Sequence, residues 1–205
     1  MSPDAPTGSR PLQVLGIAGS LRAGSYNVAL LQAAIELAPK GMEVRVFSLL
    51  GKLPLYNADL EKGSCPDAVA TLRSELGESD AVLFVTPEYN YGVPGVLKNA
   101  LDWASRPPTT TPLHGMPAGI MGATTGMVGT ARAQLQLRQA LVYTHTYPLA
   151  APEVLVARAQ DKFDANGKLC DEPTRKFVAD YMEALRQWTV RLRRPVEEVS
   201  SISVR

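Results

Sequence analysis

Residues 81–103 read AVLFVTPEYNYGVPGVLKNALDW and contain, in order, an apolar run, a polar loop and a helical segment. The first six residues carry no charge, which predicts a short strand buried on both faces of a sheet. Pro87 ends this run, and Pro94 stands where a helix can begin, because proline is tolerated in the first turn. A buried strand, a loop and a helix form the repeating unit of a parallel α/β sheet.

The same unit recurs on both sides of this segment. Apolar runs predict further strands at residues 12–18, 43–48, 118–123 and 154–157. Apolar positions at helical spacing predict further helices at residues 26–40, 69–76, 130–142 and 177–192. Five strands that alternate with helices predict an α/β protein with a flavodoxin-like, three-layer α/β/α fold and a five-stranded parallel sheet.

The composition excludes several classes of function. The 205 residues carry a formal net charge of +1, so we expect no nucleic-acid partner and no membrane partner. No stretch approaches the ~20 apolar residues of a membrane span, and residues 1–11 lack the apolar part of a secretory signal, so the expected location is cytoplasmic. Residues 1–11 and 195–205 lack periodicity, which predicts a disordered leader and a flexible tail around one domain at 12–194.

Disulfide and metal chemistry are not expected either. Cys65 and Cys170 lie far apart in the sequence and belong to no CxxC pair. His114 and His145 are too few for a multi-histidine metal centre, and we interpret both as structural or solvated residues.

Three predicted strands end in loops whose composition suggests ligand binding. The first loop, GSLRAGSYN (19–27), lies between a strand and a helix N-terminus, where free N–H groups favour an anion. Arg22 can add a charged fork, and Ser20, Ser25 and Asn27 add neutral donors. The loop is neither a Walker A loop nor a GxGxxG turn. It is therefore either a phosphate cradle or an ordinary serine-capped helix start.

The second loop, TPEYNYGVP (86–94), places two tyrosines, an asparagine and a glycine where a flat ring could lie. The alternative is a proline-bounded turn whose tyrosines pack on a neighbour. The third loop, at residues 123–129, offers hydroxyls and flexible backbone, but such loops are common. In a flavodoxin-like sheet the three loops would converge on one crevice beyond the strand ends.

Together the loops resemble a known family. The segments GSLRAGSYN (19–27) and TPEYNYGVPGVLKNALDW (86–103) are similar to the two signatures of the NADPH-dependent FMN reductase family, which includes quinone, chromate and azo-dye reductases. The resemblance implies that the first loop holds the FMN phosphate and ribityl chain, the second lines the isoalloxazine edge, and the third closes the other side. The implied residues are Ser20, Arg22, Ser25, Tyr26 and Asn27; Pro87, Glu88, Tyr89, Asn90, Tyr91 and Gly92; and Thr124, Thr125 and Gly126.

The sequence departs from the family pattern at the third loop, where Ala123-Thr124-Thr125-Gly126 replaces a run of small residues such as Ser-Pro-Gly. The helical part of the second signature is expected to serve packing, capping or dimer contacts through Lys98, Asn99, Asp102 and Trp103. The resemblance also implies a homodimer or homotetramer, with Arg132 and Glu153 as candidates for a second subunit contact.

The implied reaction needs little from side chains, because the flavin carries the hard chemistry. Hydride would pass from NADPH or NADH to FMN and on to a small acceptor, namely a quinone, an azo dye, chromate or free flavin, in a ping-pong cycle. We assign no catalytic side chain and interpret Glu88 as a structural hydrogen-bond acceptor. The alternatives are a flavodoxin-like electron carrier, against which Arg22 and the net charge argue, and a flavin-binding regulator without turnover.

Overall fold

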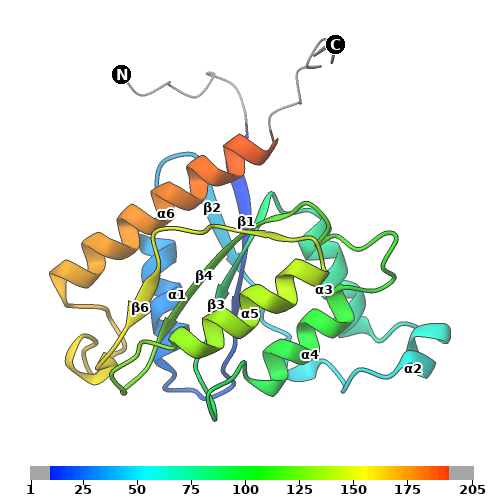
Figure 1. Cartoon of the computed structure of the whole chain (residues 1–205), viewed down its shortest axis with the longest axis horizontal. Coiled ribbons are helices and arrows are strands. Elements are labelled where there is room, and N and C mark those ends of the chain that lie inside the picture. Colours follow the sequence, from blue (N-terminus) through cyan, green and yellow to red (C-terminus); the bar gives the residue numbers. More distant parts are fainter. Residues whose placement is uncertain (1–9, 194–205) are drawn as a thin grey trace, which may run out of the picture.

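The structure is a computed structural model that describes residues 10–193. Its strands form one parallel sheet in the order β2 (Met42–Val46), β1 (Leu12–Ala18), β3 (Ala81–Val85) and β4 (Pro117–Ala123), with β5 (Tyr147–Pro148) and β6 (Val154–Val156) on the outer edge of β4. Because every pairing is parallel, all strand carboxyl ends lie at one edge of the sheet, the lower edge in Figure 1.

Helices cover both faces of the sheet. The helices are α1 (Tyr26–Glu36), α2 (Ala58–Lys62), α3 (Asp67–Gly77), α4 (Gly95–Ala104), α5 (Ala131–Tyr143) and α6 (Glu172–Arg193), with 3-10 turns at Leu50–Lys52 and Ala159–Asp161. Helices α1 and α6 lie on one face, and α3, α4 and α5 lie on the other (Figure 1). The predicted flavodoxin-like α/β/α fold is confirmed. The five-residue α2 was not predicted, since it is too short to show a periodic pattern.

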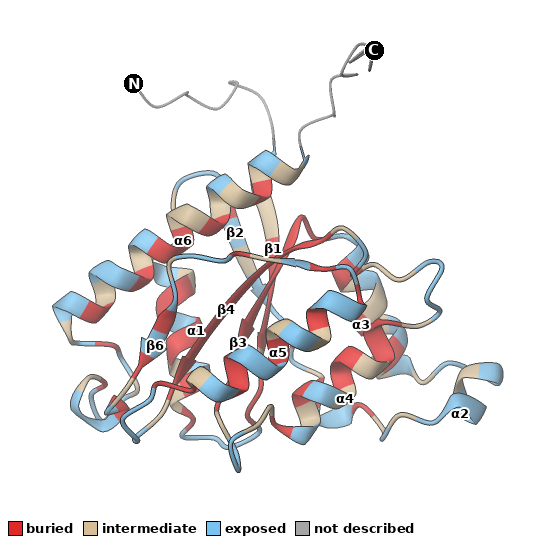
Figure 2. Cartoon of the chain, in the orientation of Figure 1, coloured by how far each residue is buried: buried red, intermediate tan, exposed pale blue. Residues whose placement is uncertain are grey.

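The core lies between these layers. Every residue of β3 and of β4 is buried, as an apolar strand with helices on both sides requires (Figure 2). Leu30 and Leu31 of α1 pack with Met182 and Leu185 of α6 on one face. Leu72 of α3 and its neighbours from α4 and α5 form a separate cluster on the other face.

The edge position beside β4 differs from the prediction of a single fifth strand at 154–157. Two short strands share this position, with Tyr147 opposite Pro117 and Val154 opposite Met121. Proline lacks an N–H group, so Pro148 and Pro152 interrupt a continuous ladder.

The gap between β5 and β6 is filled from α6. The backbone N–H of Ile120 donates a 2.6 Å hydrogen bond to the hydroxyl of Tyr181, and this side chain is fully buried. Burial raises the pKa of Tyr181 to about 12. Gly119 makes the approach of α6 possible, because a Cβ there would lie 2.9 Å from Leu185 and 3.2 Å from the Tyr181 hydroxyl.

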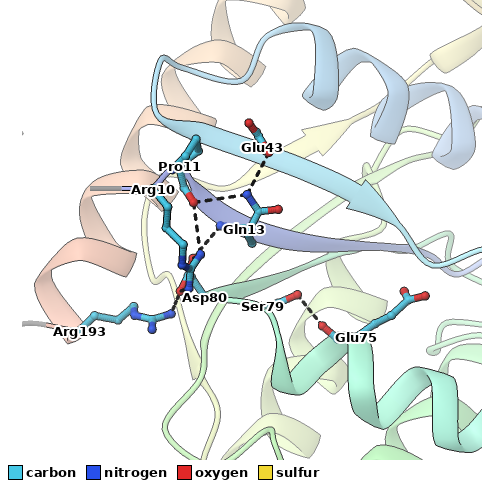
Figure 3. Close-up of polar contacts among 8 residues, drawn as sticks. All are labelled: Arg10, Pro11, Gln13, Glu43, Glu75, Ser79, Asp80 and Arg193. Atoms are coloured by element: carbon cyan, nitrogen blue, oxygen red, sulfur yellow. Dashed lines mark hydrogen bonds and ion pairs between the residues drawn. The ribbon is translucent and has the colours of Figure 1, made fainter. Parts of the chain in front are cut away.

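The two ends of the described chain meet at the opposite edge of the sheet (Figure 3). Asp80, whose side chain is 2% exposed, accepts hydrogen bonds of 2.8 and 2.9 Å from Arg10 and one of 2.7 Å from the backbone of Gln13. Arg193, at the end of α6, forms an ion pair with the same carboxylate. Arg10 falls within the predicted leader, whereas residues 1–9 of that leader and the predicted tail at 195–205 lie outside the described residues.

Candidate functional site

The carboxyl ends of β1, β3 and β4 are neighbours in the sheet, so the loops that follow them converge on one open cleft of about 140 Å³. The cleft is lined by Ser20, Arg22, Ser25, Tyr26, Asn27, Pro87, Glu88, Tyr89, Ala123, Thr124 and Thr125. All of these except Ala123 were predicted as site residues. Four other predicted residues lie outside the lining, namely Asn90, Tyr91, Gly92 and Gly126.

The first loop presents a positive charge next to the start of α1. The Ser25 hydroxyl caps this helix by accepting from the backbone N–H groups of Asn27 at 3.2 Å and Val28 at 3.5 Å. Arg22 is exposed, and its guanidinium carbon lies 5.9 Å from the centre of the Tyr26 ring. Among residues 10–193, no carboxylate pairs with Arg22. Its charge is therefore free to meet an anion.

Asn27 joins the first loop to the third. Its side-chain amide donates to the carbonyl of Ala123 and accepts from the N–H of the same residue, both at 2.9 Å, and the site is buried. Ala123 was placed in the third loop but was not predicted as a site residue, because it contributes only backbone atoms to these bonds and they leave no residue-specific signal. With both polar atoms occupied, Asn27 holds the cleft walls together, and its predicted contact with FMN stays a prediction.

The second loop is a tight hairpin. Tyr89 and Gly92 exchange backbone hydrogen bonds of 3.1 and 2.9 Å, and both residues between them have positive φ, 50° at Asn90 and 67° at Tyr91. These angles are those of a type I′ turn. A Cβ at Gly92 would lie 2.9 Å from the side-chain oxygen of Gln136, so a larger residue would displace this side chain from its 2.6 Å hydrogen bond with the N–H of Val93. The hairpin leaves Tyr89 half-exposed, with its hydroxyl 3.3 Å from that of Ser20.

The carboxylate of Glu88 accepts hydrogen bonds from the first residues of α5. Its carboxylate accepts from the Nε atom of Arg132 at 2.7 Å and from the backbone N–H groups of Arg132 at 3.0 Å and Ala133 at 3.2 Å. Burial alone would raise the pKa of Glu88, but these hydrogen bonds and the charge of Arg132 lower it below its ordinary value. Glu88 therefore acts as a hydrogen-bond acceptor for the start of α5, while its predicted contact with FMN stays a prediction, and Arg132 has a partner within its own chain.

The third loop is held against the segment after β6. The backbone N–H of Thr124 donates to Val156 at 2.9 Å, and its carbonyl accepts from Ala159 at 3.0 Å. The carbonyl of Gly126 accepts from the N–H of Arg158, also at 3.0 Å. These contacts use backbone atoms, so the Thr125 side chain is left exposed at the cleft.

Helix α4 carries the residues predicted to pack or cap rather than to bind. Trp103 is buried and donates from Nε1 to the carbonyl of Pro54 at 2.7 Å, and Asn99 donates to the same carbonyl at 2.9 Å. Lys98 and Asp102 form a 2.6 Å ion pair on the surface of the helix. The predicted packing role is confirmed for Asn99 and Trp103, and the predicted dimer contacts of this helix stay a prediction.

A sequence model of the family described as NADPH-dependent FMN reductase matches residues 12–161, from β1 through the turn that supports the third loop. The chain belongs to this family. Membership confirms the predicted class of enzyme, an NAD(P)H-dependent oxidoreductase, and its predicted cofactor, FMN. The match includes all three loops of the cleft.

Several relatives resemble the chain over nearly its whole length. An NAD(P)H-dependent FMN reductase of Pseudomonas aeruginosa is 51% identical and covers 90% of this chain and 99% of its own. A quinone reductase of Escherichia coli K12 is 37% identical, with 90% and 99% covered. The solved structure of FerB, a flavoenzyme NAD(P)H:(acceptor) oxidoreductase of Paracoccus denitrificans, superposes with a TM-score of 0.81 at 36% identity, covering 88% of this chain and 98% of that one.

Across residues 10–193, no helix combines the length and the apolar character needed to cross a membrane. The longest, α6, has 22 residues but alternates buried and charged positions.

Proposed function

We propose that the cleft binds FMN and that the family's reaction takes place there, with a quinone as the acceptor. The observation that carries this proposal is the donor set of the cleft. Arg22 brings a cation without an acidic partner among the described residues, and Ser20 and Thr125 bring hydroxyls. The one carboxylate in the lining, that of Glu88, is neutralised by Arg132. This chemistry suits a phosphate attached to a polar chain.

When bound, FMN would supply the redox chemistry by accepting hydride from the nicotinamide and passing two electrons to the acceptor. The chain's own residues would bind and orient it. Arg22 would pair with the phosphate, Thr124 and Thr125 would hold one side, and the hairpin at 87–92 would border the ring. The depressed pKa of Glu88 keeps this carboxyl ionised at neutral pH, so it offers no proton there.

A ping-pong cycle is part of the proposal. The cleft is open, and the exposed rings of Tyr89 and Tyr91 stand beside it. A planar donor and a planar acceptor could each stack at the open side, but not at the same time. Quinones are favoured because relatives over 35% identical are named quinone reductases. Azo dyes, chromate and free flavin are further acceptors to test.

We also propose a homodimer or homotetramer in the cytoplasm. Three large side chains on the outer side of α5 support self-association: Leu135, Val142 and Tyr143 are each more than 60% exposed. The cytoplasm is supported by the exposed, unpaired thiols of Cys65 and Cys170, which suit a reducing compartment. Light scattering at micromolar concentration tests the first point, and a monomer would contradict it.

The decisive experiment is anaerobic stopped-flow absorbance of the FMN-loaded protein. NADPH or NADH should bleach the flavin faster than it bleaches free FMN, and a quinone should restore the absorbance. Steady-state double-reciprocal plots with a two-electron quinone should be parallel. If neither nicotinamide reduces the flavin above the free-FMN rate, the chain acts as an electron carrier or a regulator instead.

A further inference from the structure

Arg132 contacts the cleft lining through Glu88, and only part of its guanidinium group has a hydrogen-bond partner. Its Nε atom donates to Glu88, which lines the cleft, and its side chain is still 42% exposed. Within residues 10–193 its two terminal guanidinium nitrogens have no hydrogen-bond acceptor. A guanidinium held by one edge and open at the other presents a fixed, charged fork, which matches the geometry of a phosphate.

The ring of Tyr91 stacks on this guanidinium, and the backbone of Tyr91 adopts a strained, positive φ. The guanidinium carbon of Arg132 is 3.7 Å from the centre of the Tyr91 ring, and 71% of Tyr91 is exposed. Tyr91 has a φ of 67° in a turn position that normally favours glycine. A strained, bulky residue beside a cleft points to a functional constraint on its side chain. The ring contacts Arg132 and leaves a large surface free for stacking.

The other arginines around the cleft are less suited to a second anion. Arg22 is in the lining itself and is matched to the FMN phosphate under the proposed function. Arg158, beside the third loop, is like Arg132 in donating from Nε to a carboxylate, that of Asp161 at 2.8 Å, but no aromatic ring is stacked on it in the described residues. Arg132 therefore combines guanidinium nitrogens that could bind a phosphate with the exposed aromatic ring of Tyr91 beside them.

We propose that Arg132 and Tyr91 recognise the adenosine 2′-phosphate end of NADPH, so that Arg132 determines selectivity for NADPH over NADH. The guanidinium would bind the 2′-phosphate, and the Tyr91 ring would stack on the adenine. Glu88 would be a positioning residue that fixes the fork. The inference rests on the proposed function, because it assumes that the nicotinamide substrate reaches the flavin in this cleft. It assigns Arg132 to the substrate in place of the subunit contact that the family resemblance implies.

The first test measures binding without turnover. Isothermal titration of the FMN-loaded protein with 2′,5′-ADP and with 5′-AMP separates the 2′-phosphate from the rest of the adenosine. Wild type should bind 2′,5′-ADP more tightly. Arg132→Gln should remove this advantage, roughly tenfold to a hundredfold as expected for a charge-assisted contact, and Arg132→Lys should restore part of it. Arg158→Gln is the matched control and should leave the advantage unchanged.

The second test compares kcat/KM for NADPH and NADH in the same variants. Arg132→Gln should lower the NADPH value roughly tenfold or more beyond any change in the NADH value, whereas a purely structural role would lower both equally. Equal loss for both nicotinamides, equal binding of 2′,5′-ADP and 5′-AMP by wild type, or a selective loss in Arg158→Gln would each overturn the inference. If neither nicotinamide reduces wild-type flavin, the proposed function fails first, while the titration still decides whether Arg132 binds the 2′-phosphate.

Discussion

The side chain of Asn27 and the backbone of Ala123 form two reciprocal hydrogen bonds of 2.9 Å, which join the start of α1 to the end of β4. These residues are 96 positions apart in the sequence. The bonds fix the spacing between the first and third loops. The width of the cleft therefore depends on Asn27, whose side chain bonds to backbone atoms of the third loop.

Asn27→Leu should therefore lower stability and flavin affinity together. Leucine has a similar size but leaves the Ala123 N–H and carbonyl buried without partners, at roughly 1–3 kcal/mol for each group. Urea unfolding and FMN titration measure the two effects. Asn166→Leu, at an exposed asparagine, is the control and should change stability little. Unchanged stability of Asn27→Leu would contradict the role given to this pair.

Arg22→Ala should weaken FMN binding more than riboflavin binding. Riboflavin lacks the phosphate, and a charge-assisted bond to phosphate contributes about 1.5–3 kcal/mol, or roughly tenfold to a hundredfold in affinity. Fluorescence titration of both flavins with both proteins gives the ratio of dissociation constants. If the two flavins lose affinity equally, Arg22 does not contact the phosphate.

The ion pair of Glu88 should make stability depend on pH in the acid range. The folded-state pKa of Glu88 lies below its ordinary value, so its contribution is complete above the unfolded pKa of about 4.3 and is lost as the pH falls through the folded pKa. Wild type should exceed Glu88→Gln in free energy of unfolding at pH 7, and the difference should shrink below about pH 4. A difference that stays constant from pH 7 to pH 3 would rule out this linkage.

Tyr181→Phe should destabilise the sheet at its split edge. The change removes only the hydroxyl and leaves the N–H of Ile120 buried without an acceptor, which costs roughly 1–3 kcal/mol. Tyr143→Phe, at an exposed position on α5, is the matched control. Thermal and urea unfolding should give a clearly lower free energy of unfolding for Tyr181→Phe than for Tyr143→Phe. Similar stabilities of the two variants would show that another group accepts from the N–H of Ile120.

Asp80→Asn should release the two chain ends from the amino edge of the sheet. The buried carboxylate is bonded by Arg10, Arg193 and the backbone of Gln13, and losing its charge should cost roughly 2–4 kcal/mol of stability. Arg10→Ala should cost less, because Arg193 remains paired with the carboxylate. Urea unfolding measures both, and a larger loss for Arg10→Ala would contradict the central role of Asp80.

The sequence by itself determined the architecture and the location of the candidate cleft. The run at 81–86 and the apolar spacing at 177–192 are local patterns, and a local pattern suffices to predict a buried strand or an amphipathic helix. The loops after β1, β3 and β4 carried enough chemistry to identify the cleft, because a parallel sheet brings strand ends together whatever its details. The family signatures then identified the ligand class.

Only the tertiary structure decided how individual side chains are used. Glu88 and Arg132 are 44 positions apart, and no local pattern predicts that this carboxylate of the cleft lining also caps α5. Ala123 enters the site through its backbone, which every residue shares. Tyr181 completes β4 only because the outer edge strand is split. Each of these roles depends on which atoms folding brings within hydrogen-bond distance, and that is a property of packing rather than of sequence spacing.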